Sequence, residues 1–285
     1  MTGKTISHLN LITVDPAEIL KEWEEAQFDT RKLQDFYNLV MGWPYISAEN
    51  RLSTQQVLSR CGMEPMRTRH HGPSAMGIDV QGERRGFYVV IGIKVTDKFA
   101  KILRVGNVGH INDIYDLAKK FNVKCAVIDE QPEQRLSHDF ARNAPFQAFS
   151  CKYKESQRKD VDWNSKERLV SFNRTELCDE THDLIAEDGR VELPRKCFDM
   201  ETYADQMNNT GKTLDKEKEA ETGVKRYTYN KKFGDDDYYH ATNYFLLALR
   251  RVGVSREEKK KVTVRDAYDD ALRDSLSQHV GFMGM

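Results

Sequence analysis

The sequence SAMGIDVQGERRGFYVVIGI, residues 74–93, contains two short apolar runs joined by a polar turn. The first run is Ala75–Val80, the second is Gly86–Ile93, and Gln81–Arg85 lies between them. Apolar runs of this length on either side of a turn segment predict two antiparallel strands. We expect a third strand at Lys101–Gly106, which would complete a meander.

Helical and apolar segments alternate after this meander. Ile111–Phe121 carries apolar side chains at helical spacing, and Cys125–Asp129 begins with four apolar residues, as in a strand buried on both faces. A second helix is expected from Pro132 towards Ala141, and a further strand at Phe146–Ser150. Three meandering strands followed by helix, strand, helix and strand predict an α/β fold with a mixed sheet.

The later part of the chain has a less regular pattern. A strand is expected at Leu169–Phe172 and a helix at Arg174–Ala186. Residues 199–232 are polar and are expected to be mostly loops, whereas Asp236–Val252 is the strongest helix pattern in the chain.

Composition divides the chain into three parts. Residues 1–72 combine helical patterns with a polar linker, so we expect a helical N-terminal extension before an α/β domain at residues 73–254. The charged residues 255–285 are expected to form a C-terminal tail.

The overall composition is that of a soluble globular protein in a reducing cytosol. Hydrophobic residues make up 39% and charged residues 31%, and the formal net charge is -1. Any nucleic-acid surface must therefore come from local clusters of Lys and Arg. The five cysteines show no C-x-x-C spacing, which disfavours a disulfide framework and a thiolate zinc site. Neither a signal peptide nor a membrane-spanning apolar run is expected.

Two aspartates occupy places where a strand is otherwise apolar. Asp79 interrupts the first run on the strand face that it shares with Gly77 and Gln81, and Asp129 closes the buried run that begins at Cys125. An ionised carboxylate in such a place costs several kcal/mol unless it is paired, hydrogen-bonded or bound to a metal. If the two strands are neighbours, both acids reach the same sheet edge, where α/β proteins collect their sites.

A third acidic position is the run of Asp235, Asp236 and Asp237 at the start of the strongest helix. One acid there is an ordinary N-cap, but three in a row repel one another, and a divalent cation would relieve the repulsion. Oxygen ligands favour Mg²⁺ or Mn²⁺, and two such ions about 4 Å apart would clamp a phosphodiester for in-line attack by water. The alternative is that these aspartates are turn, cap and solvated residues without a metal.

Several segments occur in an order and spacing that point to one protein family. They are Gly77–Gln81, Phe87–Val90, Val127–Asp129, Val170–Thr175, Val191–Pro194 and Asp236–Tyr244. Together they resemble the nuclease domain of phage terminase large subunits, and Phe36–Tyr45 resembles the segment that joins the motor ATPase to that nuclease. The resemblance covers about residues 30–250. It implies a ribonuclease H-like fold in residues 73–254, with a two-metal carboxylate site.

The resemblance also implies roles for individual residues. Asp79, Asp129 and one acid of the Asp236–Asp237 pair would ligate two Mg²⁺ or Mn²⁺ ions and catalyse cleavage. Family members often carry an acid directly before the Ala of the last motif, where this chain has His240. We therefore favour Asp237 over Asp236 and interpret His240 as an auxiliary ligand or proton-transfer group, with a packed helix residue as the alternative. Weaker candidates are two further acids, Glu83 and Glu130.

The implied function is an endonuclease that cleaves concatemeric viral DNA during genome packaging, with low sequence specificity, in the host cytoplasm. Its implied partners are double-stranded DNA, a packaging ATPase domain or subunit, the portal and the small terminase, with no membrane. The phosphate loop of the ATPase half does not occur in this sequence. We therefore expect either an excised part of a longer ATPase-nuclease or a separately encoded nuclease.

DNA phosphates are expected to contact two basic clusters, one after the strand at residues 146–150 and one before the acidic helix. The candidates are Lys152, Lys154, Arg158, Lys159, Lys231 and Lys232. Such charge runs are also common on surfaces that are simply solvated. Two alternative functions stay open: a junction resolvase or recombinase with the same fold, and a docking module of the motor without catalytic activity.

Overall fold

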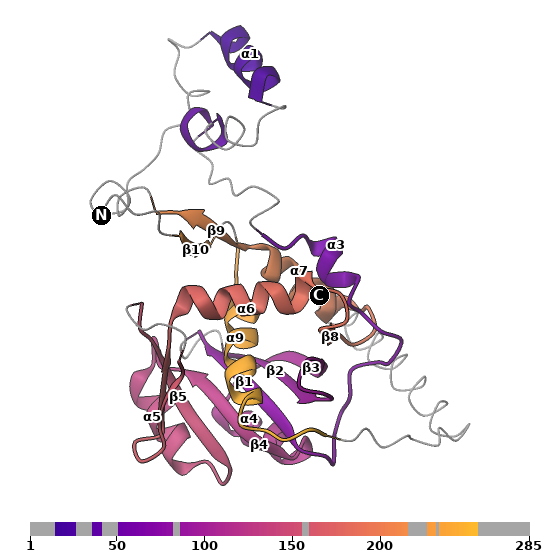
Figure 1. The fold of residues 1–285 in the computed structure, drawn as a ribbon, viewed down its shortest axis with the longest axis vertical. Coiled ribbons are helices and arrows are strands. Elements are labelled where there is room, and N and C mark those ends of the chain that lie inside the picture. Colours follow the sequence, from indigo (N-terminus) through magenta and orange to yellow (C-terminus); the bar gives the residue numbers. More distant parts are fainter. Residues whose placement is uncertain are drawn as a thin grey trace, which may run out of the picture. The chain divides into compact units, whose positions relative to one another are not determined.

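An eight-stranded sheet is the centre of the structure, which is a computed structural model. It describes residues 15–26, 36–41, 51–81, 86–155, 160–215, 227–231 and 234–255. By its contacts the chain divides into Met1–Ser255 and Arg256–Met285, and every described residue lies in the first unit. The strand order in the sheet is β6-β7-β5-β4-β1-β2-β3-β8, and Figure 1 shows most of these strands.

The central strands form the predicted meander. β1 (Ser74–Val80) pairs antiparallel with β2 (Phe87–Lys94), and β2 pairs antiparallel with β3 (Ala100–Val108). Every residue of β1 is buried, so this strand has protein on both of its faces.

Parallel strands extend the sheet on the other side of β1. β4 (Val123–Asp129) runs parallel to β1, and β5 (Gln147–Tyr153) runs parallel to β4. The remaining strands are β6 (Asp162–Asn164), β7 (Leu169–Phe172) and β8 (Val191–Glu192). The predicted mixed α/β sheet is confirmed, and β4 is the buried parallel strand that its apolar run indicated.

Helices cover both faces of the sheet. α4 (Ile111–Lys120) and α5 (Gln134–Asn143) contribute to a core on one face, together with Met76 and Ile78 of β1. α9 (Asp237–Leu249) contributes to a larger core on the opposite face. The other helices of this larger core are α3 (Thr54–Leu58), α6 (Arg174–Ala186) and α7 (Phe198–Asn208).

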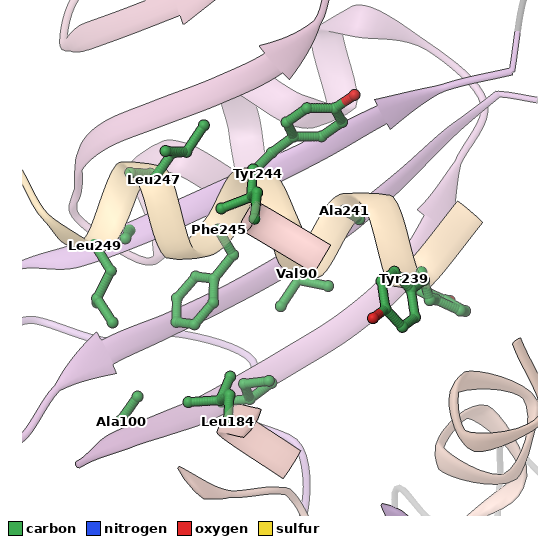
Figure 2. Packing of buried hydrophobic residues seen from close by; sticks show 14 of the residues in the cluster. Val90, Ala100, Leu184, Tyr239, Ala241, Tyr244, Phe245, Leu247 and Leu249 are labelled. Carbon is green, nitrogen blue, oxygen red and sulfur yellow. The ribbon is translucent and has the colours of Figure 1, made fainter. Parts of the chain in front are cut away.

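Two glycines let α9 lie very close to the sheet. A Cβ on Gly77 would lie 2.0 Å from the carbonyl oxygen of Ala241 and 2.1 Å from the backbone nitrogen of Phe245. Because these are backbone atoms of α9, no side-chain rotation would relieve the clash. A Cβ on Gly92 would lie 2.5 Å from the carbonyl oxygen of Lys101 in β3 and 2.8 Å from the Phe245 ring, which packs against the strands in Figure 2. The missing side chain of Gly77 thus sets the distance between α9 and β1, and Gly92 leaves room for the Phe245 ring.

The expectation that residues 199–232 are mostly loops is wrong. α7 occupies most of the first part, and it is followed by an antiparallel ribbon of β9 (Thr210–Leu214) and β10 (Tyr227–Lys231). Residues 216–226 lie outside the described part. Helical spacing does relate the residues that α7 buries completely, which are Met200, Tyr203, Ala204 and Met207. Because charged residues lie between these buried ones, the helical spacing is not evident from the composition of the segment.

The N-terminal part contributes a small cluster of its own. α1 (Pro16–Ala26) and the single π-helical turn η2 (Phe36–Val40) bury Ile19, Ala26, Phe36 and Val40 against one another. The division of the chain at residues 72/73 stays a prediction. Within the described residues, no helix is both long enough and apolar enough to cross a membrane.

Candidate functional site

Strands β1 and β4 bring Asp79 and Asp129 to the same edge of the sheet. The strands are parallel neighbours, and Ile78 lies opposite Ile128, so each aspartate occupies the next position along its strand. Both lie on the α9 face, because alternation along the strands groups Asp79 with Gly77 and Asp129 with Val127 of the α9-side core.

Helix α9 brings the third acidic position to this edge. Asp236 is the N-cap of α9, Asp237 is its first residue, and His240 follows one turn later. These three residues line an open cavity of about 310 Å³ together with Asp79 and Asp129. The other residues of its wall are Val80, Gln81, Gln131, Pro132 and Lys231. Acids from two strands and one helix therefore face one cavity.

Gln81 joins two of these acids directly. Its Nε2 donates a hydrogen bond to Oδ2 of Asp79 at 3.0 Å and another to Oδ1 of Asp237. The sequence already indicated that Gln81 shares a strand face with Asp79, but it did not identify the glutamine as a site residue. The spacing of two residues between them was the signal that could have done so.

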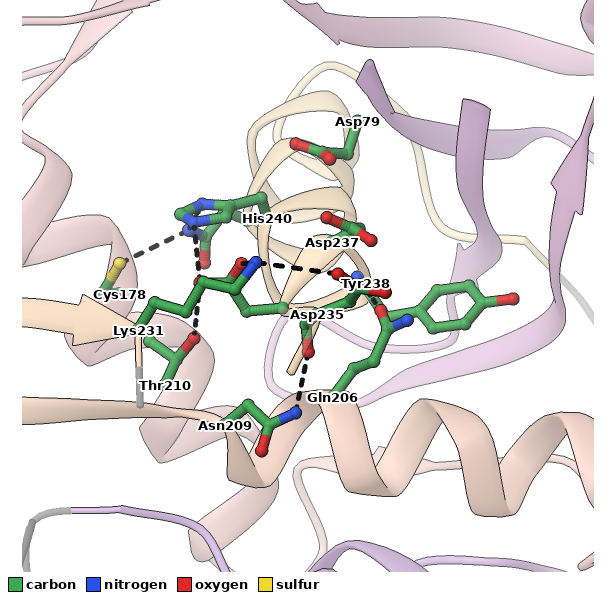
Figure 3. A network of polar contacts seen from close by, with 12 residues as sticks. Asp79, Cys178, Gln206, Asn209, Thr210, Lys231, Asp235, Asp237, Tyr238 and His240 are labelled. Carbon is green, nitrogen blue, oxygen red and sulfur yellow. Dashed lines mark hydrogen bonds and ion pairs between the residues drawn. The ribbon is translucent and has the colours of Figure 1, made fainter. Parts of the chain in front are cut away.

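Asp236 is held by three protein groups. Its Oδ2 accepts a hydrogen bond from the Thr210 hydroxyl at 3.2 Å and lies 3.7 Å from Nε2 of His240. Its Oδ1 lies 3.2 Å from Nζ of Lys231, and Figure 3 shows this network. Burial alone would raise the pKa of Asp236, but His240 and Lys231 outweigh it and lower the pKa to about 2. Asp236 is therefore an ionised acid with its own protein counter-charges.

The other acids of the cavity have the opposite electrostatic environment. Burial raises the pKa of Asp79 to about 8, although the charge of His240 opposes the shift. Burial and the acidic neighbours of Asp237 raise its pKa to about 6. Burial also raises the pKa of Asp129, while the backbone N–H of Gln131 and the Tyr244 hydroxyl lower it. These carboxylates would be stabilised by an added positive charge.

His240 forms part of a buried polar chain between α6 and α9. Its Nδ1 lies 3.4 Å from the Tyr153 hydroxyl, to which Asn243 donates from Nδ2 at 3.2 Å. The hydroxyl of Thr181 in turn donates to Oδ1 of Asn243 at 2.5 Å. This chain contacts the Nδ1 side of the imidazole, so Nε2 is the atom that faces Asp236. Burial lowers the pKa of His240, but Asp236 and Asp79 outweigh it, and the net shift is upward.

The donor chemistry of the cavity fits a hard divalent cation. Asp79, Asp129 and Asp237 offer carboxylate oxygens, which Mg²⁺ and Mn²⁺ prefer. The buried Tyr244 hydroxyl beside Asp129 lacks a hydrogen-bond partner of good geometry within the described residues. As the side chains stand, no three His, Cys, Asp or Glu residues in the described part of the chain are gathered tightly enough to hold a metal ion. The Gln81 amide stands between Asp79 and Asp237 instead.

The remaining predicted site residues lie elsewhere. Glu130 is directed to α5, where its Oε1 lies 3.0 Å from Nε2 of His138 and accepts a hydrogen bond from Gln134 at 3.3 Å. Lys152 is exposed on β5, the strand next to β4, and Lys154 is exposed directly after that strand. Outside the described residues lie Glu83, Arg158, Lys159 and Lys232.

This chain is similar to terminase large subunits. Residues 5–94, a range that includes Asp79, match the family model described as terminase large subunit gpA, endonuclease domain. The crystal structure of the HK97 bacteriophage large terminase matches with a TM-score of 0.43 and 13% sequence identity, over 82% of this chain and 50% of that chain. This chain therefore spans about half the length of that terminase. No curated protein matches it.

The strand order also agrees with the predicted fold class. An antiparallel meander, β3-β2-β1, is continued by the parallel strands β4 and β5, and helices cover both faces. This is a ribonuclease H-like arrangement. The family match over residues 5–94 and this fold confirm the resemblance of the chain to the nuclease domain of phage terminase large subunits.

Proposed function

We propose that this chain is a divalent-metal-dependent endodeoxyribonuclease that cuts concatemeric viral DNA during genome packaging. The observation that carries the proposal is the cavity onto which Asp79, Asp129 and Asp237 converge from three separate elements. The terminase endonuclease family supports DNA as the substrate and packaging as the context. Contacts to phosphates rather than to base edges would make the cleavage largely independent of sequence.

Three of the acids would hold the metal. Asp79, Asp129 and Asp237 would ligate two Mg²⁺ or Mn²⁺ ions, and Gln81 would orient two of these carboxylates. When bound, the metal would supply the positive charge that stabilises in-line hydrolysis of a phosphodiester. We favour Asp237 over Asp236, because Asp236 already has Thr210, Lys231 and His240 as partners.

The other residues of the cavity wall would act on protons and phosphates. His240 would hold or transfer a proton at Nε2, since the buried chain through Tyr153 contacts its other nitrogen. Lys231, whose side chain is half exposed, would contact a phosphate of the DNA.

Plasmid cleavage with Mg²⁺ or Mn²⁺ tests the proposal. We expect the wild-type chain to cut the plasmid, and Asp79→Ala and Asp129→Ala to reduce cutting to background. Asp97→Asn is the matched control, because Asp97 is an exposed aspartate outside the cavity. Calorimetry should show Mn²⁺ binding to the wild type and the control, and weakened binding to both cavity variants. Full cleavage by both cavity variants would contradict the proposal.

The same assay separates the alternative functions. A four-way junction that is cut faster than linear DNA would indicate a junction resolvase. A wild-type chain that neither binds Mn²⁺ nor cuts any of these substrates would indicate a docking module without catalytic activity.

A further inference from the structure

The β9–β10 ribbon contacts two carboxylates through two neighbouring cross-strand pairs that lie on the same face of the ribbon. Tyr229 pairs with Lys212 across the ribbon, and Lys231 pairs with Thr210. Residues two apart in a strand share a face, and so do cross-strand partners, so all four side chains project from the same side. The pair of Lys231 and Thr210 contacts Asp236 of the cavity wall.

The other pair, Tyr229 and Lys212, contacts Asp179 of helix α6. Nζ of Lys212 lies 2.8 Å and 3.0 Å from the two carboxylate oxygens of Asp179, and the Tyr229 hydroxyl donates to Oδ1 at 2.7 Å. Burial, and then the Asp179 carboxylate, raise the pKa of Tyr229, so its hydroxyl remains a donor. The Lys212 ammonium also lies 5.9 Å from the centre of the Tyr229 ring. Asp179 thus accepts three hydrogen bonds that fasten the ribbon to α6.

The neighbouring pair places the ammonium group of Lys231 at the cavity. Lys231 is the one Lys or Arg among the described residues that line the carboxylate cavity. Its Nζ lies 3.2 Å from Oδ1 of Asp236, and its side chain is 47% exposed, so the ammonium can also meet a ligand from solvent. Its direction depends on the ribbon, because Lys231 is the last residue of β10.

We propose that Asp179 is a positioning residue: it fastens the β9–β10 ribbon to α6 and so holds Lys231 at the carboxylate cavity, where the ammonium contacts a phosphate of bound DNA. The inference rests on the proposed function, since it requires DNA in the cavity. An isolated two-stranded ribbon is marginally stable in water, so the direction of Lys231 needs an anchor outside the ribbon. Asp179 supplies this anchor through Tyr229, which lies two residues before Lys231 on the same face of β10.

The test measures binding of a short DNA duplex to the full chain against salt concentration, by fluorescence anisotropy in EDTA so that no cleavage occurs. Lys231→Ala should weaken binding and lower the slope of log K against log salt by about 0.9, the value for one phosphate contact. Asp179→Asn should cause most of the same loss. Loss of a negative charge would by itself strengthen DNA binding, so weaker binding indicates positioning.

A double variant separates positioning from a general structural effect. In the Lys231→Ala background, Asp179→Asn should cause no further loss of affinity or of slope, and Asp179→Glu should restore part of the slope when Lys231 is present. Glu187→Gln is the matched control, because it removes the same charge from the end of α6 and breaks a 2.7 Å pair with Arg190. This control should bind DNA at least as tightly as the wild type, with the wild-type slope.

The outcomes distinguish this inference from the proposed function. A wild-type slope in Asp179→Asn, or a loss that adds fully to that of Lys231→Ala, would overturn the positioning role. Tight DNA binding with the expected coupling, but no cleavage in Mg²⁺, would overturn the nuclease function and leave the positioning role standing.

Discussion

At the scale of single residues, Asp79 is an acid whose ionisation opposes folding of the metal-free protein. Burial raises its pKa from 3.8 to about 8. An acid with a higher pKa in the folded chain binds its proton more tightly there. The resulting contribution to the free energy of unfolding is fully present below the pKa of the acid in the unfolded chain. It is lost as the pH rises through the folded pKa. We therefore expect the free energy of unfolding of the metal-free protein to fall between about pH 4 and pH 8.

Thermal unfolding in EDTA checks this prediction. The Tm of the wild type should be lower at pH 8 than at pH 5, and Asp79→Asn should lose much of this difference and be the more stable chain at pH 8. Added Mn²⁺ should raise the Tm of the wild type at pH 8 more than that of the variant. Asp97→Asn should behave like the wild type. An identical pH dependence in Asp79→Asn and wild type would contradict the assigned environment.

Substitution by asparagine should have different effects at the neighbouring acids Asp236 and Asp237. Asp237→Asn should weaken Mn²⁺ binding in calorimetry and abolish cleavage, because burial and acidic neighbours raise the pKa of Asp237 despite the charges of Lys231 and His240. Asp236→Asn should keep Mn²⁺ binding and lose DNA affinity, because Asp236 holds Lys231 and Thr210. Equal loss of Mn²⁺ binding in both variants would show that both acids are ligands.

At the scale of elements, the close contact between α9 and β1 leads to a prediction about Gly77. Gly77→Ala places a methyl group 2.0 Å from the Ala241 carbonyl, so α9 must move. Overpacking of this kind costs about 1–3 kcal/mol, and the shift would also displace Asp237 from Asp79. We expect a lower midpoint in urea unfolding together with a loss of cleavage.

Gly106→Ala in β3 is the matched control for this change. No atom lies within 4 Å of a Cβ built at Gly106, so the added methyl group meets open space. It should leave both stability and cleavage close to the wild type. Wild-type stability and cleavage in Gly77→Ala would show that α9 tolerates a larger separation from the sheet.

The elements that sequence patterns predicted are those with a clear periodicity. The predicted helix at residues 174–186 agrees with α6, and the buried apolar run before Asp129 agrees with β4. α7 and the β9–β10 ribbon were missed, because charged residues separate their buried ones and because Lys212 and Tyr229 pack through a carboxylate. Tertiary contacts, rather than local pattern, stabilise these elements.

At the scale of the whole molecule, the sequence could predict which acids lie at one edge of the sheet more easily than which side chains link them. Asp79 and Asp129 were identifiable because a charge in a buried strand needs a partner. The hydrogen bonds from Gln81 to Asp237 and from Thr210 to Asp236 join distant segments, which no local spacing encodes. The preference for Asp237 over Asp236 came from a family pattern and stays a prediction, which the contacts of Asp236 with Thr210 and Lys231 support.

The long separation between the acids along the chain has a consequence for synthesis. Gln81 and Asp237, which one hydrogen bond joins, lie 156 residues apart. Closing such a long loop is slow, and domains fold as their segments leave the ribosome, at about 5–20 residues per second. β1 and β4 therefore emerge roughly ten seconds before α9, so nascent chains carry two of the acids without the third. The proposed cutting site would therefore be complete only after nearly the whole described chain has been made.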